Sequence, residues 1–257
     1  HPGFPLPQGE RQTCMSSGFA FFQSAKSAKK RFSPWGNGNP GWHIECTAMS
    51  TKYLGTQFDI HGGGMDLKFP HHEDEIAQNC GSFGCNPARY WMHANMLNVN
   101  GQKMSKSFGN YFLPKEIVEG TSALFKKPYA ASVVRFFMLQ AHYRSTLDIT
   151  EEALNASEKG FERLTEGLSL LEKLTPSSNS TFEVAKLISA ADAAICDDFN
   201  APILIAALFD AVKYIHAINE GKEQLTQEDL LQFSQAMNTF VQDVLGIEPT
   251  KKEENQR

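Results

Sequence analysis

Long apolar runs and the common nucleotide-binding and hydrolase motifs are missing from this sequence. No stretch approaches about 18 uncharged apolar residues, so we expect no membrane-spanning helix. The first eleven residues contain three prolines and no apolar core, which predicts that there is no signal peptide. The patterns G-x-x-x-x-G-K-[ST], G-x-G-x-x-G and G-x-S-x-G are absent, which argues against a P-loop, a dinucleotide-binding loop and a hydrolase elbow.

Cysteine is also sparse, with five in 257 residues. An odd number at irregular spacing predicts a reducing compartment, and we expect a cytoplasmic protein whose thiols are buried, catalytic or metal-binding. The composition, 41% hydrophobic and 21% charged, is that of an ordinary globular chain of one large or two medium domains.

The net charge of −5 conceals an asymmetry along the chain. Residues 1–150 are net positive, whereas residues 151–257 are net negative. The first part is therefore the better candidate for a surface that attracts a polyanion. Solvated faces of two unlike domains explain the charges equally well.

The first part has the alternating pattern of an α/β layer. Residues 1–32 predict an irregular lead-in with one helix near 19–30. Later residues predict a helix over 45–53, a strand over 57–61 that three glycines stop, a helix over 71–78, and a strand over 90–99 that ends in the turn Asn100-Gly101.

The second part has helical periodicity. Apolar residues at spacings of three, four and seven predict helices over 154–171, 182–194 and 202–217, the last with Ile203 facing inward. A fourth helix is expected after Thr226 as its N-cap and ends at Gly246. Four such helices predict an antiparallel bundle, followed by a charged tail over 249–257.

Three residues have the types and spacing of a metal site. His71 and Glu75 lie four apart on a predicted helix, so their side chains share one face, and Cys46 lies 25 residues earlier. Thiolate, imidazole and carboxylate together suit zinc, which needs one further ligand. A surface His–Glu pair and a buried cysteine are the alternatives, and Cys80 with Cys85 is a weaker rival pair.

A glycine-flanked loop follows the turn at 100–101. It carries Lys103 and Lys106 together with Ser105 and Ser107, and lysines and hydroxyls of this kind can bind phosphate. The alternative is a solvated basic hairpin tip.

These motifs resemble one family. Residues 103–107 read Lys-Met-Ser-Lys-Ser and resemble the KMSKS signature of class I aminoacyl-tRNA synthetases. Residues 40–49 and 59–78 are similar to the cysteinyl-tRNA synthetase branch of that family. Residues 197–202, Asp-Asp-Phe-Asn-Ala-Pro, are similar to the helical bundle that follows its catalytic fold.

The resemblance implies a fold that is α/β and then all-α. It places the second half of a Rossmann-like catalytic domain over 33–110, a connecting segment over 111–150 and a DALR-type antiparallel bundle over 151–248. It also implies that Cys46, His71 and Glu75 are three of four zinc ligands, with one Zn²⁺ per chain.

The resemblance further implies roles for five more residues. Trp42 and Asp66 match positions that line the amino-acid pocket; a core indole and a turn carboxylate are the alternatives. Lys106, supported by Lys103, matches the ATP phosphate contact. His93 is a weaker nucleotide-side candidate, and a structural histidine is its alternative. No acid or base residue is assigned.

The implied activity is that of a cysteine–tRNA ligase, which activates cysteine with ATP and Mg²⁺ and transfers it to tRNA(Cys). We expect a monomer without membrane contact. Because no H-x-G-H motif occurs and Cys14 lacks the context of the family's fourth zinc ligand, we expect a partial chain that also lacks the anticodon-binding end. Such a chain alone should not form cysteinyl adenylate at a normal rate. The rival functions are a non-catalytic zinc- or tRNA-binding module and a ligase that joins cysteine to an aminosugar.

Overall fold

The computed structural model describes residues 41–248. The expected lead-in, the helix near 19–30, Cys14 and the charged tail lie outside these residues. The chain divides into two compact units, which meet in the sequence between Asn95 and Met96. Each unit is described by itself.

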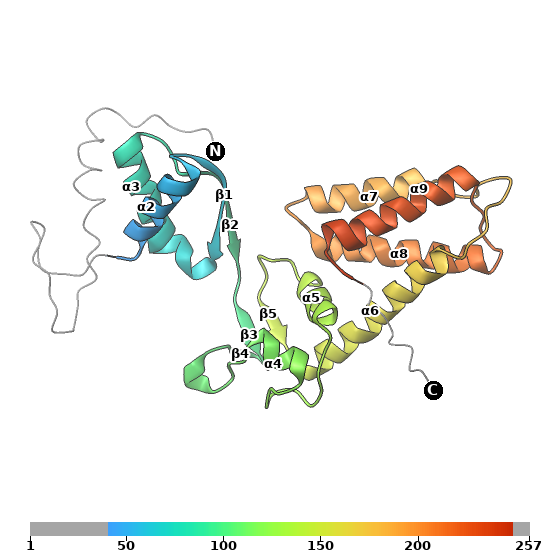
Figure 1. Ribbon diagram of the computed structural model, residues 1–257, viewed down its shortest axis with the longest axis horizontal. Helices are drawn as coiled ribbons and strands as arrows, with labels where there is room; N and C mark the ends of the chain where they lie inside the picture. Colours follow the sequence, from blue (N-terminus) through green and yellow to red (C-terminus); the bar gives the residue numbers. More distant parts are fainter. Residues whose placement is uncertain (1–40, 249–257) are drawn as a thin grey trace, which may run out of the picture. The chain divides into compact units, whose positions relative to one another are not determined.

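The first unit is a small α/β layer. Strands β1 (Phe58–Gly64) and β2 (Ala88–Ala94) pair in parallel, and helix α3 (Glu73–Phe83) connects them, as a parallel pair requires. Helix α2 (His43–Leu54) packs against α3 (Figure 1). A 3₁₀ turn, Met65–Leu67, and a π-helical turn, Lys68–His72, lead from β1 into α3.

Three expectations for this unit need correction. The glycines at 62–64 do not stop the strand, because glycine adopts extended backbone and here pairs with residues 92–94 of β2. The helix expected over 71–78 begins at Glu73, and His71 lies in the π-helical turn before it. The strand expected over 90–99 is two strands, β2 and β3 (Leu97–Val99), which belong to different units.

The second unit begins with a three-stranded sheet in the order β4-β3-β5, where β4 is Gln102–Lys103 and β5 is Leu147–Ile149. β3 and β4 form the expected hairpin, and Asn100 and Gly101 have φ of 51° and 77°, the left-handed values that a two-residue hairpin turn demands. β5 pairs in parallel with β3. Helices α4 (Pro114–Glu119) and α5 (Ala131–Leu139) lie between β4 and β5 in the chain.

The helical bundle follows β5 directly. It consists of α6 (Glu151–Leu171), α7 (Val184–Cys196), α8 (Ala201–Asn219) and α9 (Gln227–Asn238), the last continued by a π-helical turn, Thr239–Val244 (Figure 1). Thr150, Asn200 and Thr226 accept N-cap hydrogen bonds at the starts of α6, α8 and α9. The four expected helices are therefore confirmed.

Helix α8 departs from the expected face. Ile203 is 52% exposed, and the neighbouring Leu204 and Ile205 are buried instead. By length and composition alone α8 could cross a membrane, although it contains the charged residues Asp210 and Lys213. It packs against α6 and α7 within the bundle, and 44% of that apolar window is buried there, as in the core helix of a globular domain.

The sheet and the bundle share one hydrophobic core. Val99 of β3, Ile117 of α4 and Phe136 of α5 belong to the same buried cluster as Leu164 of α6 and Ile215 of α8. The expected boundaries at 110 and 150 are therefore not breaks in packing, and the loop with the two lysines belongs to the bundle unit rather than to the α/β unit.

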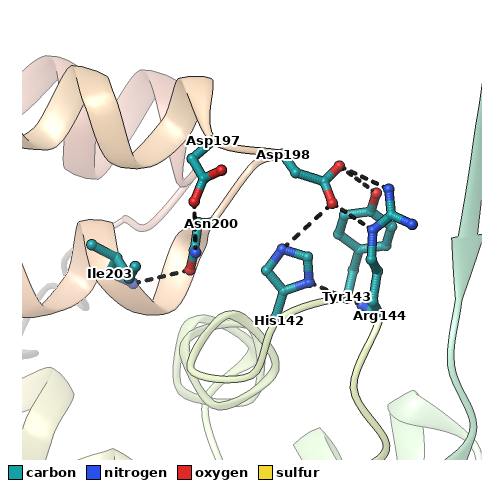
Figure 2. A network of polar contacts seen from close by, with 7 residues as sticks. All are labelled: His142, Tyr143, Arg144, Asp197, Asp198, Asn200 and Ile203. Atoms are coloured by element: carbon teal, nitrogen blue, oxygen red, sulfur yellow. Dashed lines mark hydrogen bonds and ion pairs between the residues drawn. The ribbon is translucent and has the colours of Figure 1, made fainter.

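A polar corner joins the sheet to the bundle within this unit. Asp198, in the turn between α7 and α8, accepts hydrogen bonds from Tyr143 Oη at 2.7 Å and from the Arg144 guanidinium, and His142 Nε2 lies 3.8 Å from its carboxylate (Figure 2). Asp198 and Phe199 both have φ of 55°, a strained value for residues other than glycine. The corner fastens the segment before β5 to the bundle.

Candidate metal centre and phosphate-binding loop

The three predicted metal ligands come together in the first unit. Cys46 projects from α2, His71 from the π-helical turn, and Glu75 from the first turn of α3. The Cys46 Sγ, one ring nitrogen of His71 and one carboxylate oxygen of Glu75 all lie within 4.8 Å of one another. The four-residue spacing brings His71 Nε2 to 2.9 Å from Glu75 Oε1, as the helical register requires.

The orientation of these groups differs from that of an ordinary hydrogen-bonded pair. Glu75 is only 2% exposed, and its Oε1 has no hydrogen-bond partner among the described residues although His71 Nε2 is close. His61 Nε2 lies 2.9 Å from Glu75 Oε2 and is likewise buried without hydrogen-bond geometry. Buried polar atoms without hydrogen bonds need an explanation, and atoms that point toward a common cation would have this arrangement.

Burial sets the protonation of the group. It raises the pKa of Glu75 to about 7, and it raises the pKa of the Cys46 thiol, which the nearby carboxylates of Glu75 and Glu45 raise further. Burial also lowers the pKa of His71, and the neighbouring His43 adds to this effect. All three side chains thus favour their neutral forms, and a divalent cation would reverse this preference for the thiol and the carboxyl.

The donor set fits zinc. One soft thiolate, one imidazole and one carboxylate are ligands that Zn²⁺ takes in proteins, and ligand atoms within 4.8 Å are compatible with one tetrahedral centre. Among residues 41–248 no fourth protein ligand joins these three as a single group; the other candidate group shares Glu75 and uses His61 and His72. Cys80 and Cys85 take no part in either group.

A second cluster lies beside the predicted metal ligands and was not found from the sequence: the histidine group of His61, His72 and His93. His72 is 3% exposed and lies 2.8 Å from His93, Nδ1 to Nε2, while its ring contacts His61 and Trp91. Burial and the neighbouring histidines lower the pKa of His72 to about 4. No signal in the sequence could have found this group, because it depends on the register of the parallel strands β1 and β2, which opposes His61 to Trp91 and Gly63 to His93.

Gly63 allows this close packing. A Cβ at this position would come within 2.7 Å of His72 Cε1, nearer than side-chain atoms approach one another. The strand therefore needs glycine where it passes the buried imidazole.

The two predicted pocket residues lie on the surface of the first unit. Trp42 immediately precedes α2 and is 81% exposed, which excludes a core indole. Asp66 is exposed in the turn Met65–Leu67, with its carboxylate packed against Gly64. His93, the nucleotide-side candidate, contacts the buried histidines instead of standing alone. The binding roles of all three stay predictions.

The lysine loop occupies the hairpin edge of the second unit. Lys103 ends β4, and Lys106 begins a short 3₁₀ turn, Lys106–Phe108, for which Ser105 is the N-cap. Both lysines are exposed, and Lys106 Nζ lies 5.2 Å from the centre of the Tyr111 ring. The loop presents two mobile positive charges near an aromatic face, which suits a polyphosphate.

Comparisons with known proteins identify the family of the chain and its domains. The family model described as the class I (C) tRNA synthetase catalytic domain matches residues 8–159, upstream of the start near Ser33 that the motifs indicated, and a DALR domain model matches residues 191–248. The cysteine–tRNA ligase of Parabacteroides distasonis is 50% identical over 215 residues, which are 84% of this chain and 44% of that protein. That of Cytophaga hutchinsonii is 43% identical over 251 residues, 93% of this chain and 50% of that protein.

A solved structure supports the fold alone. The LeuRS–tRNA–LeuAMS ternary complex of Agrobacterium radiobacter K84 matches with a TM-score of 0.56 at 16% identity, over 82% of this chain and 31% of that one. The chain spans about half the length of the curated relatives it matches. Since the catalytic-domain model covers more than half of the chain, the chain belongs to the family of class I (C) tRNA synthetase catalytic domains.

Proposed function

We propose that this chain is part of a cysteine–tRNA ligase, which activates cysteine with ATP and transfers it to tRNA(Cys). The observation that carries the proposal is the convergence of a thiol, an imidazole and a carboxylate within 4.8 Å in a chain of this family. The relatives' names support it, since those at up to 50% identity are called cysteine–tRNA ligase. The finer properties of the enzyme, a monomer in the cytoplasm that pairs ATP with Mg²⁺, are part of the proposal.

Zinc accounts for the choice of amino acid. Cysteine and serine differ by sulfur for oxygen, and a plain pocket separates such close analogues weakly. Cys46, His71 and Glu75 would hold Zn²⁺, which when bound supplies a Lewis acid that prefers a soft thiolate to a hydroxyl. His61 Nε2 lies 2.9 Å from the second carboxylate oxygen of Glu75, on the side away from the oxygen that faces His71.

The lysine loop accounts for the reaction with ATP. When the cysteine carboxylate attacks the α-phosphate, negative charge accumulates on the phosphate oxygens and the departing pyrophosphate. Lys106, with Lys103 beside it, provides positive charge for those oxygens. The contribution of these residues is positioning and charge stabilisation, so no side chain is required as nucleophile or base.

Cobalt substitution tests the metal assignment without requiring catalysis. Co²⁺ bound by a thiolate gives a visible absorption band, which we expect in this chain and in Cys196→Ser, whose cysteine is exposed on α7. We expect Cys46→Ser to lose the band. Free cysteine should then shift the spectrum of the cobalt-loaded chain at concentrations where serine has no effect. An equal response to both amino acids, or a band that survives in Cys46→Ser, contradicts the proposal.

Product analysis tests the reaction itself. The chain, together with any polypeptide needed for adenylate formation, is incubated with ATP and cysteine and either tRNA(Cys) or an aminosugar. We expect cysteinyl-tRNA as the product. Coupling to the aminosugar alone indicates the rival ligase, whereas tRNA binding without any cysteine-dependent ATP–pyrophosphate exchange indicates a non-catalytic module.

A further inference from the structure

One side chain, Asn110, closes the lysine loop across its neck. Its Oδ1 accepts a hydrogen bond from the Ser105 amide at 2.8 Å. Its Nδ2 donates to the carbonyl oxygens of Lys103 at 3.2 Å and of Gln102 at 3.4 Å. A carboxamide suits this place because it offers a donor and an acceptor at once, and here it serves three backbone groups on the opposite side of the loop.

The base of the loop is held separately. The Gly101 amide donates to both carboxylate oxygens of Asp148 on β5, at 2.9 and 3.1 Å. The Met104 side chain packs against the hydrophobic core, whereas Lys103 and Lys106 on either side of it are exposed. The backbone is therefore fastened at its base and neck while both ammonium groups face solvent.

We propose that Asn110 is a positioning residue that keeps this loop closed, so that Lys103 and Lys106 meet a polyphosphate in a preformed arrangement. The inference rests on the proposed function for the identity of its ligand. Each lysine side chain loses considerable rotamer freedom on binding, and a loop that also had to order its backbone would lose more. Because the contacts of Asn110 order the loop backbone in the free protein, ligand binding does not have to pay this backbone entropy.

Amide hydrogen exchange measures loop closure directly. The informative amides are those of Met104 and Gly109, which donate to Leu97 O at 3.1 Å and to Lys106 O at 3.2 Å, because Asn110 makes neither bond. In Asn110→Ala we expect both to exchange at least about fivefold faster, the factor that corresponds to one net hydrogen bond. The matched control is Gln102→Ala, which shortens an exposed side chain of β4 and keeps the backbone carbonyl that Asn110 contacts, so it should exchange as the wild type does.

The same spectra follow the binding of inorganic tripolyphosphate, the probe for the ligand. We expect tripolyphosphate to shift the loop amides of the wild type and of Gln102→Ala at the same concentration. Asn110→Ala should need up to about fivefold more tripolyphosphate for the same shift, because only molecules with a closed loop bind it. The positioning role is overturned if the wild type and Asn110→Ala reach half-saturation at the same tripolyphosphate concentration. It is also overturned if the amides of Met104 and Gly109 exchange at the wild-type rate in Asn110→Ala, or if the Leu208 amide in the bundle speeds up by the same factor. If tripolyphosphate leaves even the wild-type loop unaffected, the phosphate role in the proposed function fails instead.

Discussion

The packing of Gly63 against His72 makes a quantitative prediction for Gly63→Ala. A methyl group at this position meets His72 Cε1 at 2.7 Å and Nε2 at 3.0 Å. The imidazole has little room to retreat, because it is 3% exposed and contacts His61, Trp91 and His93. Overpacking of this kind costs about 1–3 kcal/mol. Replacing a strand glycine by alanine returns about 0.5–1 kcal/mol, so we expect a net destabilisation of up to about 2.5 kcal/mol.

The neighbouring glycine provides the matched control. A Cβ at Gly62 has only one contact, Met92 O at 3.8 Å, which is ordinary van der Waals distance. Gly62→Ala should therefore be neutral or slightly stabilising. Urea unfolding followed by tryptophan fluorescence is the assay, since the three tryptophans of the chain are at positions 35, 42 and 91. Equal midpoints for the two variants would refute the reasoning.

The same substitution should weaken the metal centre. His72 is adjacent in sequence to the proposed ligand His71 and contacts its ring, with the ring centres 5.7 Å apart. Displacing His72 moves the support of a ligand, and losses of support around metal ligands cost about 10–100-fold in metal affinity. We expect the Co²⁺ affinity to fall within that range in Gly63→Ala and to remain unchanged in Gly62→Ala. Unchanged affinity in both variants would show that the histidine group does not support the ligands.

Three further predictions concern the second unit. Gly167→Ala places a methyl 2.9 Å from the buried Val212, so overpacking of about 1–3 kcal/mol exceeds the helix-propensity gain of about 1 kcal/mol, and the urea midpoint should fall; an unchanged or higher midpoint contradicts this. Phe199→Gly relieves a φ of 55° at an exposed side chain, which should raise the melting temperature by about 2–4 °C; a decrease contradicts the strain argument. Hydrogen bonds from the Arg144 guanidinium and Tyr143 Oη hold the pKa of Asp198 below its ordinary value. The wild type should therefore be more stable than Asp198→Asn above the unfolded-state pKa of the carboxyl, and this difference should vanish as the pH falls through the folded-state pKa. A difference that grows on acidification contradicts this.

The local features of the fold could be predicted from the sequence. The tight turn at Asn100-Gly101 and the N-cap at Thr226 depend on residues within one turn of the chain, and both were predicted correctly. The approach of His71 to Glu75 follows from helical spacing alone. The types and spacing of the residues already suggested Cys46 as the third member of the group, but left a buried cysteine as the alternative, and the family resemblance was what favoured the metal site.

The features that were missed depend on contacts between distant residues. The histidine group arises from the pairing of β1 with β2, a register that a single sequence does not specify. The inward face of α8 was misassigned at Ile203 because apolar residues surround that helix, so periodicity cannot single out one face. The continuation of β1 through three glycines depends on β2 and on the packing of His72, whereas the local preference of glycine is for turns.

The burial of Glu75 distinguishes a functional centre from a structural one. Glu75 is 2% exposed, and the imidazoles of His61 and His71 each lie 2.9 Å from its carboxylate. Because burial lowers the pKa of both histidines, they supply little compensating positive charge near neutral pH. An ionised carboxylate in this position is destabilising because no opposite charge compensates its burial, and for the same reason burial raises the pKa of Glu75 to about 7. Such an arrangement is explained if a cation binds there.

The burial of the Glu75 carboxylate predicts opposite effects of Glu75→Gln on folding stability and on metal binding. Because the pKa of Glu75 is raised to about 7, its carboxylate carries a full charge only above that pH. Glutamine keeps the size of the side chain and removes this charge, so in urea unfolding above pH 7 the metal-free variant should be at least as stable as the metal-free wild type. Its Co²⁺ band should nevertheless weaken or disappear, because a neutral carboxamide is a poor ligand for the cation. A control in the same helix, Glu73→Gln, changes an exposed carboxylate and should alter neither property. A loss of stability in metal-free Glu75→Gln would mean that the carboxylate serves the fold, and the case for a cation site would lose its energetic basis.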